Sequence, residues 1–149
     1  MSYGSSSDFT VYSGSKGGNA EIGGNGGFGS GWLQLNGRDI IINGVLNFRG
    51  SDGVDSSNDG GGGGGSAGTI LINGRNVNLD NAKINLQGGN GGGTTSDHGY
   101  GGTGSGGRFK VFYENTFSNS GWTMNIGTGT IYFWKIMWLN LNSKKDNFK

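Results

Sequence analysis

Three segments of this sequence share one pattern of short alternating apolar runs, and this pattern limits the chain to a repetitive β architecture. A glycine opens each segment, at Gly31, Gly68 and Gly107, so the repeats are 37 and 39 residues apart. Asn-Gly-Arg stands at the same place in the first two repeats, at 36–38 and 73–75. A fixed spacing of this kind is the signature of stacked repeat proteins.

Each repeat predicts three short strands. Alternation with a period of two places one side-chain face in a core and the other in water. We therefore expect an all-β fold, a parallel β-solenoid of about three short three-strand coils. The predicted inward residues are Leu33, Leu35, Ile40, Ile42, Leu46 and Phe48; Ile70, Ile72, Val77, Leu79, Ile84 and Leu86; and Phe109, Val111, Phe117, Met124 and Ile126.

Asn-Gly dipeptides recur within this pattern, at 36–37, 43–44 and 73–74. Asn and Gly tolerate a positive φ angle, which a tight turn between strands requires. Stacked coils also align asparagine side chains into hydrogen-bonded ladders. The pattern favours turn and ladder roles for these asparagines over ligand binding.

Glycine accounts for 36 of the 149 residues and gathers in tracts between the repeats, while proline is absent. The tracts are either flexible loops or ordered, polyproline-II-like segments that pack closely because glycine has no Cβ. Their recurrence at one place in every repeat favours order. The polar stretches at 54–59 and 94–100 predict tips at which the chain turns and comes back.

Composition excludes several classes of protein. A net charge of +1 excludes a strongly basic nucleic-acid binder or membrane anchor. The longest apolar run, 131–139, has nine residues, whereas crossing a bilayer takes about 20, so we expect no membrane insertion. The absence of cysteine excludes disulfides and thiolate metal sites. No secretory signal is visible at the N-terminus.

Candidate catalytic and metal-binding residues are few. His98 stands alone in a polar tip, and Glu21 and Glu114 occupy non-equivalent places, so we expect no enzyme and no cofactor. Asp52, Asp55 and Asp59 lie close together, which suits either a solvated loop or a weak Ca²⁺ site. The glycine tracts lack the lysine and the following helix of a phosphate-binding loop.

Exposed aromatic residues are the feature that would suit carbohydrate binding, because their rings stack on sugars. Packing in a core or an interface is the plainer interpretation of the same residues. They are dispersed along the chain, at Tyr3, Tyr12, Trp32, Tyr100, Tyr113, Trp122 and Tyr132. Ice binding would need a flat array of regularly spaced threonines, and the threonines form none.

The two ends of the repeat region predict self-assembly. Residues 1–130 hold the repeats, and 131–149 hold an apolar strand and a polar tail. A strand that is apolar on both faces needs cover on both sides, here from another subunit by strand addition or stacking. Phe9 and Val11 match a third strand, so we expect the chain to start midway through a coil. The predicted interface residues are Ile131, Phe133, Trp134, Ile136, Met137, Trp138, Leu139, Phe9 and Val11. The alternative is a strand packed inside its own domain and capped by 140–149.

The tracts at 88–93 and 104–111, with Gly-Thr-Ile-Tyr at 129–132, resemble the glycine-rich solenoid repeats of large secreted or surface proteins of bacteria and of protists such as ciliates. Those repeats are similar to right-handed parallel β-helices of the pectin-lyase-like kind. The tracts also resemble polyproline-II bundles in phage adhesin tips and in an insect antifreeze protein. The resemblance covers about 23–132 and transfers no catalytic residue. It implies a right-handed solenoid with a structural, adhesive or matrix role.

Together these features predict a non-enzymatic structural protein, a subunit of an extracellular fibre or a surface adhesion module. The expected partner is a further copy of the chain, in an oligomer or polymer, located outside the cell or at its surface. The alternative is a carbohydrate-binding module on a β-helix scaffold, with a glycan as partner. An enzyme of the pectin-lyase type ranks third.

Overall fold

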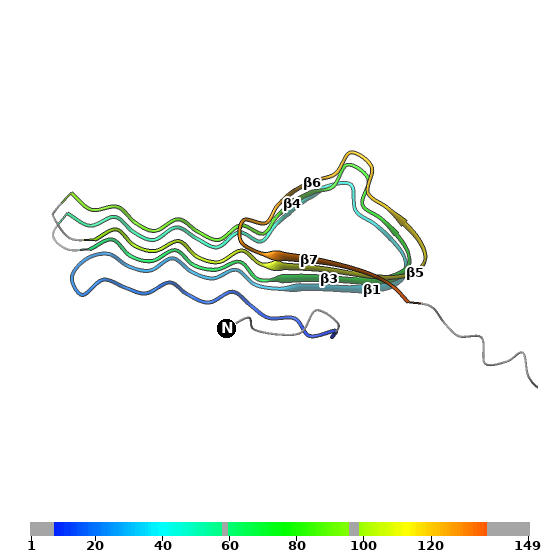
Figure 1. Cartoon of the computed structure of the whole chain (residues 1–149), viewed down its shortest axis with the longest axis horizontal. Coiled ribbons are helices and arrows are strands. Elements are labelled where there is room, and N and C mark those ends of the chain that lie inside the picture. The colour runs from blue at the N-terminus through cyan, green and yellow to red at the C-terminus, as the bar shows by residue number, and fades with distance from the viewer. Residues whose placement is uncertain (1–7, 58–59, 96–98, 137–149) are drawn as a thin grey trace, which may run out of the picture.

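The structure, a computed structural model, describes residues 8–57, 60–95 and 99–136, and over these ranges it is all-β (Figure 1). Its strands are β1 (Leu33–Ile41), β2 (Val45–Asn47), β3 (Thr69–Asn78), β4 (Lys83–Asn85), β5 (Arg108–Ser118), β6 (Thr123–Asn125) and β7 (Thr130–Lys135). The long sheet has the order β1-β3-β5-β7, the short sheet has the order β2-β4-β6, and all neighbouring strands are parallel. Within these ranges no helix is long and apolar enough to cross a membrane.

The register of the strands confirms the repeat seen in the sequence. In the long sheet Leu33 lies opposite Ile70, which lies opposite Phe109. Ile131 of β7 continues the same row. The short sheet aligns Leu46, Ile84 and Met124 in the same way. We call each long-sheet strand, with the segments that connect it to the short sheet, a pass of the chain. Successive passes therefore place like residues beside like residues.

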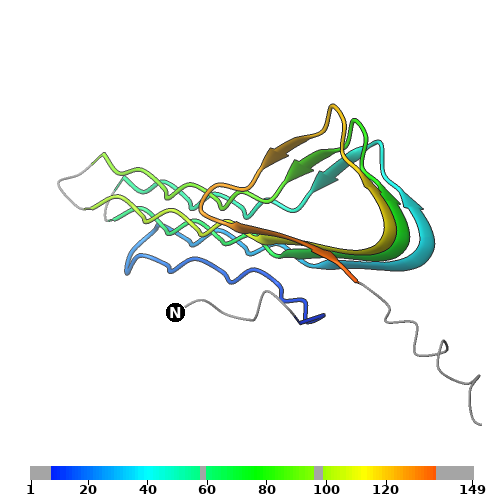
Figure 2. The same ribbon diagram turned by 45° about the vertical axis from the view of Figure 1, so that its right-hand side comes forward.

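Figure 2 shows the two sheets on different sides of the interior. The core between them consists of residues that the alternation predicted. Its fully buried members come mainly from the middle pass: Ile70, Ile72, Val77, Leu79, Ile84 and Leu86, together with Phe109 and Val111 of β5. The inward residues of β1 and β2, and also Phe117, Met124 and Ile126, are only partly buried. They belong to the two ends of the stack, where a neighbouring pass covers them on one side only.

The expectation of a separate first and second strand in each repeat is wrong. The Asn-Gly-Arg tripeptides lie inside β1 and β3, where Gly37 pairs with Gly74. A two-residue turn needs a positive φ, and the described residues with positive φ are Gly23, Asn81, Gly121 and Gly127. The ladder to the next pass continues through the tripeptide, so one long strand curves around the core (Figure 2). The dipeptide at 43–44 does lie between two strands, as predicted.

Asparagine side chains form the predicted ladders between passes. Asn73 donates from its amide nitrogen to the side-chain oxygen of Asn36, at 3.3 Å. The side-chain oxygen of Asn76 accepts a hydrogen bond from Asn115, at 2.9 Å. The first bond joins residues that lie directly opposite each other, and the second joins Asn76 to the residue before its partner Thr116. Both extend the polar outer surface of the long sheet from one pass to the next.

The glycine tracts run away from the sheets, turn and return as wavy, extended segments (Figure 1). The described segments are 12–20, 24–31, 48–56, 60–68, 86–94 and 99–107, which we call the glycine bundle. Within segment 60–68, every third amide donates to the same neighbour: those of Gly61, Gly64 and Ala67 reach Gly99, Gly102 and Ser105. The amides between them donate to 48–56 and to 12–20. These regular bonds favour the ordered interpretation of the tracts over flexible loops.

Residues 8–12 cross the outer face of the long sheet and join neither sheet. The ring of Phe9 stacks on Phe112 of β5, with centroids 4.4 Å apart. The expectation that Phe9 and Val11 form a third-strand segment is therefore wrong. Their alternation resembles that of the third strands, but Phe9 packs on a side chain of the outer face of the long sheet.

The outer face of the long sheet is buried at Leu71 and Lys110, so the expectation of a face open to water is wrong there. Both residues alternate with core residues, yet both are 0% exposed. The ammonium group of Lys110 donates to the Asp8 carboxylate at 2.8 Å and to the carbonyl of Thr10 at 3.2 Å. A buried ammonium ion needs such partners because removing it from water costs several kcal/mol.

Candidate assembly surfaces and a polar groove

The predicted assembly segment includes the outer strand at one end of the long sheet. Ile131, Phe133 and Trp134 lie in β7, and Ile136 follows it and donates its amide to the Tyr113 carbonyl at 2.7 Å. Ile131 and Phe133 are each 41% exposed, and Trp134 is 62% exposed. Met137, Trp138 and Leu139 lie outside the described residues.

An aromatic cluster lies under β7 and forms one end of the core. The ring of Phe133 lies 5.0 Å from that of Phe117 and 5.8 Å from that of Trp122, centroid to centroid. Phe109 borders the same cluster. β7 therefore packs on its own domain through Phe133. Much of that side chain nevertheless stays exposed. We call this surface the β7 end.

The opposite surface, which we call the β1 end, was missed by the sequence reasoning. Trp32 precedes β1 and is 53% exposed, while Ile41 and Val45 are 73% and 67% exposed. Leu33 and Leu35 of β1 are only partly buried. The available signal was the repeat itself: a first repeat has no earlier repeat to cover its inward residues.

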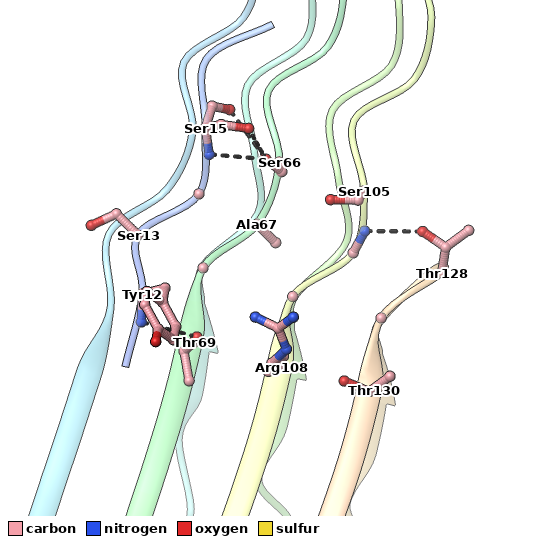
Figure 3. A pocket seen from close by; sticks show the side chains of 15 residues that line it. Tyr12, Ser13, Ser15, Ser66, Ala67, Thr69, Ser105, Arg108, Thr128 and Thr130 are labelled. Carbon is pink, nitrogen blue, oxygen red and sulfur yellow. Dashed lines mark hydrogen bonds between the residues drawn. The ribbon is translucent and has the colours of Figure 1, made fainter. Parts of the chain in front are cut away.

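A polar groove of about 680 Å³ lies where the glycine bundle meets the long sheet (Figure 3). Its walls come from four parts of the chain: 12–15, 66–69, 105–108 and 128–130. Arg108, the first residue of β5, lies between Tyr12 on one side and Thr130 on the other. None of the lining residues is acidic.

Several serine and threonine side chains line the groove. The hydroxyl oxygens of Ser15 and Ser66 are 2.7 Å apart. The Thr128 hydroxyl oxygen accepts a hydrogen bond from the backbone amide of Gly106 at 3.1 Å. Further hydroxyls come from Ser13, Ser105, Thr69 and Thr130. Sequence reasoning missed this site because its residues belong to three passes and the N-terminal segment, and only the fold brings them together.

The aspartates considered as a weak calcium site serve, where described, as acceptors for neighbouring groups. Asp52 accepts hydrogen bonds from the Arg49 guanidinium and from the Asn90 amide, the latter at 2.6 Å. These two bonds, with Arg49 the larger cause, hold the pKa of Asp52 below its ordinary value of 3.8. Asp55 also accepts a backbone amide, and Asp59 lies outside the described residues. The described ranges contain no group of three or more acidic or histidine side chains suited to a metal ion.

The aromatic residues considered for sugar stacking do not form one platform. Tyr12 lines the groove, whereas Trp122 and Tyr113 pack in the aromatic cluster or stack on Phe117. Trp32 lies near the β1 end, and Tyr100 is 78% exposed on the glycine bundle. Tyr3 and His98 lie outside the described residues.

The chain matches no protein-family model, no curated protein and no solved structure. The resemblance to glycine-rich solenoid repeats therefore rests on the sequence motifs alone. The geometry of the two ends and of the groove is the basis for the function proposed below.

Proposed function

We propose that this chain is a non-enzymatic structural module, a right-handed parallel β-solenoid with polyproline-II-like glycine tracts, that stacks end to end with further copies. The resulting polymer is an extracellular fibre or a surface adhesion assembly. The observation that carries the proposal is the in-register stacking of β1, β3, β5 and β7, in which both outer strands have a free edge among the described residues.

The two free edges are complementary because the stack repeats itself. β7 presents outward the same kind of strand edge that β5 presents to β7. At the other end of the sheet, β1 presents outward the same kind of edge that β3 presents to β1. Continuing the register sets Ile131 of one copy opposite the partner subunit's Leu33. A head-to-tail contact of this type does not close on itself, and it generates an open filament.

Apolar side chains at both ends favour the same contact. Burying a fully exposed large apolar side chain contributes roughly 1.5–3 kcal/mol, so a half-exposed one contributes about half of that. Phe133 at the β7 end and the partly buried inward residues Leu33 and Leu35 at the β1 end are among these side chains. Stacking would cover them as the middle pass is covered already.

The glycine bundle supports the finer assignment of the tracts. Hydrogen bonds recur at every third residue in segment 60–68, and a polyproline-II helix has three residues per turn. The bundle accompanies the passes of β1, β3 and β5, whereas only residues 126–129 connect β6 to β7. The resemblance to secreted and surface repeats supports an extracellular location.

A carbohydrate-binding module is the second candidate. The observation that favours it is the hydroxyl-lined groove beside Arg108. An enzyme of the pectin-lyase type remains third, because the acidic residues Glu21 and Glu114 occupy non-equivalent places in the repeat.

Cysteine cross-linking tests the stacking contact, because the native chain has no cysteine. The stacking register sets Gln34 opposite Tyr132 of a second copy, since these residues share one row of the long sheet. Within one chain they are three strand spacings apart, about 14 Å, which is too far for a disulfide. The double variant Gln34→Cys/Tyr132→Cys should give a ladder of disulfide-linked multimers on a non-reducing gel.

The matched control shifts one cysteine by two residues. Gln34→Cys/Trp134→Cys keeps both thiols on the same face but sets them about 7 Å out of register, so it should cross-link far less. Negative-stain electron microscopy of the native chain at several concentrations should show filaments. Uniform monomers, or equal cross-linking by the two pairs, would overturn the proposed contact.

A further inference from the structure

Arg108 is a cation without a partner in the part of the chain that the structure describes. It follows the same alternation as Lys110 on the outer face of the long sheet, but the ammonium group of Lys110 is bound by Asp8. Arg108 is a half-buried residue that lines the groove, and its guanidinium makes no ion pair or hydrogen bond with a described residue. A guanidinium that is partly shielded from water binds a carboxylate more strongly than an exposed one, often through two parallel hydrogen bonds.

The surroundings of Arg108 suit a sugar better than a bare anion. The hydroxyls of Ser13, Ser105 and Thr130 have no side-chain hydrogen bond to described residues, so they are free to donate and accept. Thr69 is buried, and its hydroxyl oxygen accepts a hydrogen bond from the backbone amide of Tyr12, which fixes Tyr12 beside the groove. The volume of about 680 Å³ lies within the range of small-ligand sites.

Tyr12 adds an aromatic wall to the groove. Its side chain lies across from Arg108 and belongs to the N-terminal segment, not to the sheet (Figure 3). It is 41% exposed, so part of its ring remains open to a ligand. An aromatic face, several free hydroxyls and one unpaired cation together match a ring with hydroxyl groups and one carboxylate.

We propose that this groove binds a carboxylate-bearing sugar at the end of a glycan, with Arg108 holding the carboxylate and the hydroxyls of the groove holding the ring. The proposal stands apart from end-to-end stacking, because the groove lies within one chain. It would give the structural module a point of attachment to a surface glycan.

Titration calorimetry with 3′-sialyllactose and with lactose tests the proposal, since these probes differ by one carboxylate-bearing sugar. We expect the full chain to bind 3′-sialyllactose at least about tenfold more tightly than lactose, as the loss of charge-assisted hydrogen bonds implies. Arg108→Gln should weaken binding of 3′-sialyllactose by a similar factor. Arg108→Lys should restore only part of it, because lysine lacks the planar fork.

The matched control is Arg75→Gln, which removes the same charge from an exposed arginine outside the groove. It should leave binding unchanged, and circular dichroism should show that each variant keeps the fold. Inorganic phosphate serves as the third probe. The proposal fails if 3′-sialyllactose does not bind, if Arg108→Gln binds it as well as the native chain does, or if phosphate binds as tightly.

Discussion

At the scale of single residues, the glycine bundle depends on the absence of side chains at defined positions. A Cβ built on Gly64 would lie 2.2 Å from the carbonyl oxygen of Gly89, far inside contact distance, whereas one on Gly102 would meet no atom within 4 Å. Gly64 and Gly102 are hydrogen-bonded neighbours in the same bundle. The high glycine content is therefore a packing requirement at some positions and not at others.

This difference gives a paired prediction. Gly64→Ala should lower the free energy of unfolding by about 2 kcal/mol or more, because backbone must move to admit the methyl group. Gly102→Ala should be neutral, or stabilising by up to about 1 kcal/mol, since alanine restricts the unfolded chain. Urea unfolding of both variants measures the difference. Equal losses would show that the segments do not pack as described.

Two carboxylates predict how stability depends on pH. The pKa of Asp52 is lowered by Arg49 and the Asn90 amide, and that of Asp80 by the Ser118 hydroxyl and then the Ser120 amide. A carboxylate whose pKa is lowered in the folded state contributes stability at pH values above its unfolded-state pKa, here 3.8. This contribution is lost as the pH falls through the folded-state pKa. Thermal melting temperatures should therefore fall as the pH drops below about 4.

The corresponding variants give the control. Asp80→Asn removes the titrating group, so the native chain should lose more stability than this variant when the pH is lowered from neutral to below about 4. Asp52→Asn should behave in the same way. If the native chain and the variants lose the same amount of stability as the pH is lowered, the assignment of these hydrogen bonds is contradicted.

At the scale of elements, residues 8–12 pack against the outer face of the long sheet and cover part of it. Asp8 is bound to the buried Lys110, and Phe9 covers Phe112. These contacts join positions about a hundred residues apart in the sequence, as shown by the separation of 102 between Asp8 and Lys110. The segment thus links the start of the chain to the third pass of the sheet.

Removal of the Asp8 charge tests this link. Asp8→Asn should lower the free energy of unfolding by roughly 1.5–3 kcal/mol, because the buried ammonium of Lys110 loses its carboxylate. Glu21→Gln, a similar change at an exposed carboxylate, should have little effect. Guanidinium unfolding of the three proteins measures the difference. If Asp8→Asn is as stable as Glu21→Gln, then Lys110 does not depend on this carboxylate.

At the scale of the whole molecule, burial follows the position of a pass within the stack. Ile70, Ile72 and Leu79 of the middle pass are fully buried, while the equivalent residues of the first pass, Leu33, Leu35 and Ile42, are partly exposed. In stacked repeat proteins, stability is a sum of the stability of each repeat and of the contacts between neighbours. A copy added at either end would give the outer passes the environment that the middle pass already has.

The sequence by itself determined the all-β character, the inward residues and the alignment of the passes. These properties are local or periodic: alternation selects the face, and the repeat spacing selects the partner, as the row of Leu33, Ile70 and Phe109 shows. Most of the predicted core could therefore be named without a structure.

The tertiary structure alone decided what covers each face and where a ladder continues. Asn-Gly at 36–37 is a turn signal in isolation, yet pairing with the next pass keeps it extended. Lys110 was expected to face water, yet the distant Asp8 binds it. The groove at Arg108 is likewise assembled from several segments. In each case the deciding contact comes from residues far away in the sequence, and local pattern carries no information about it.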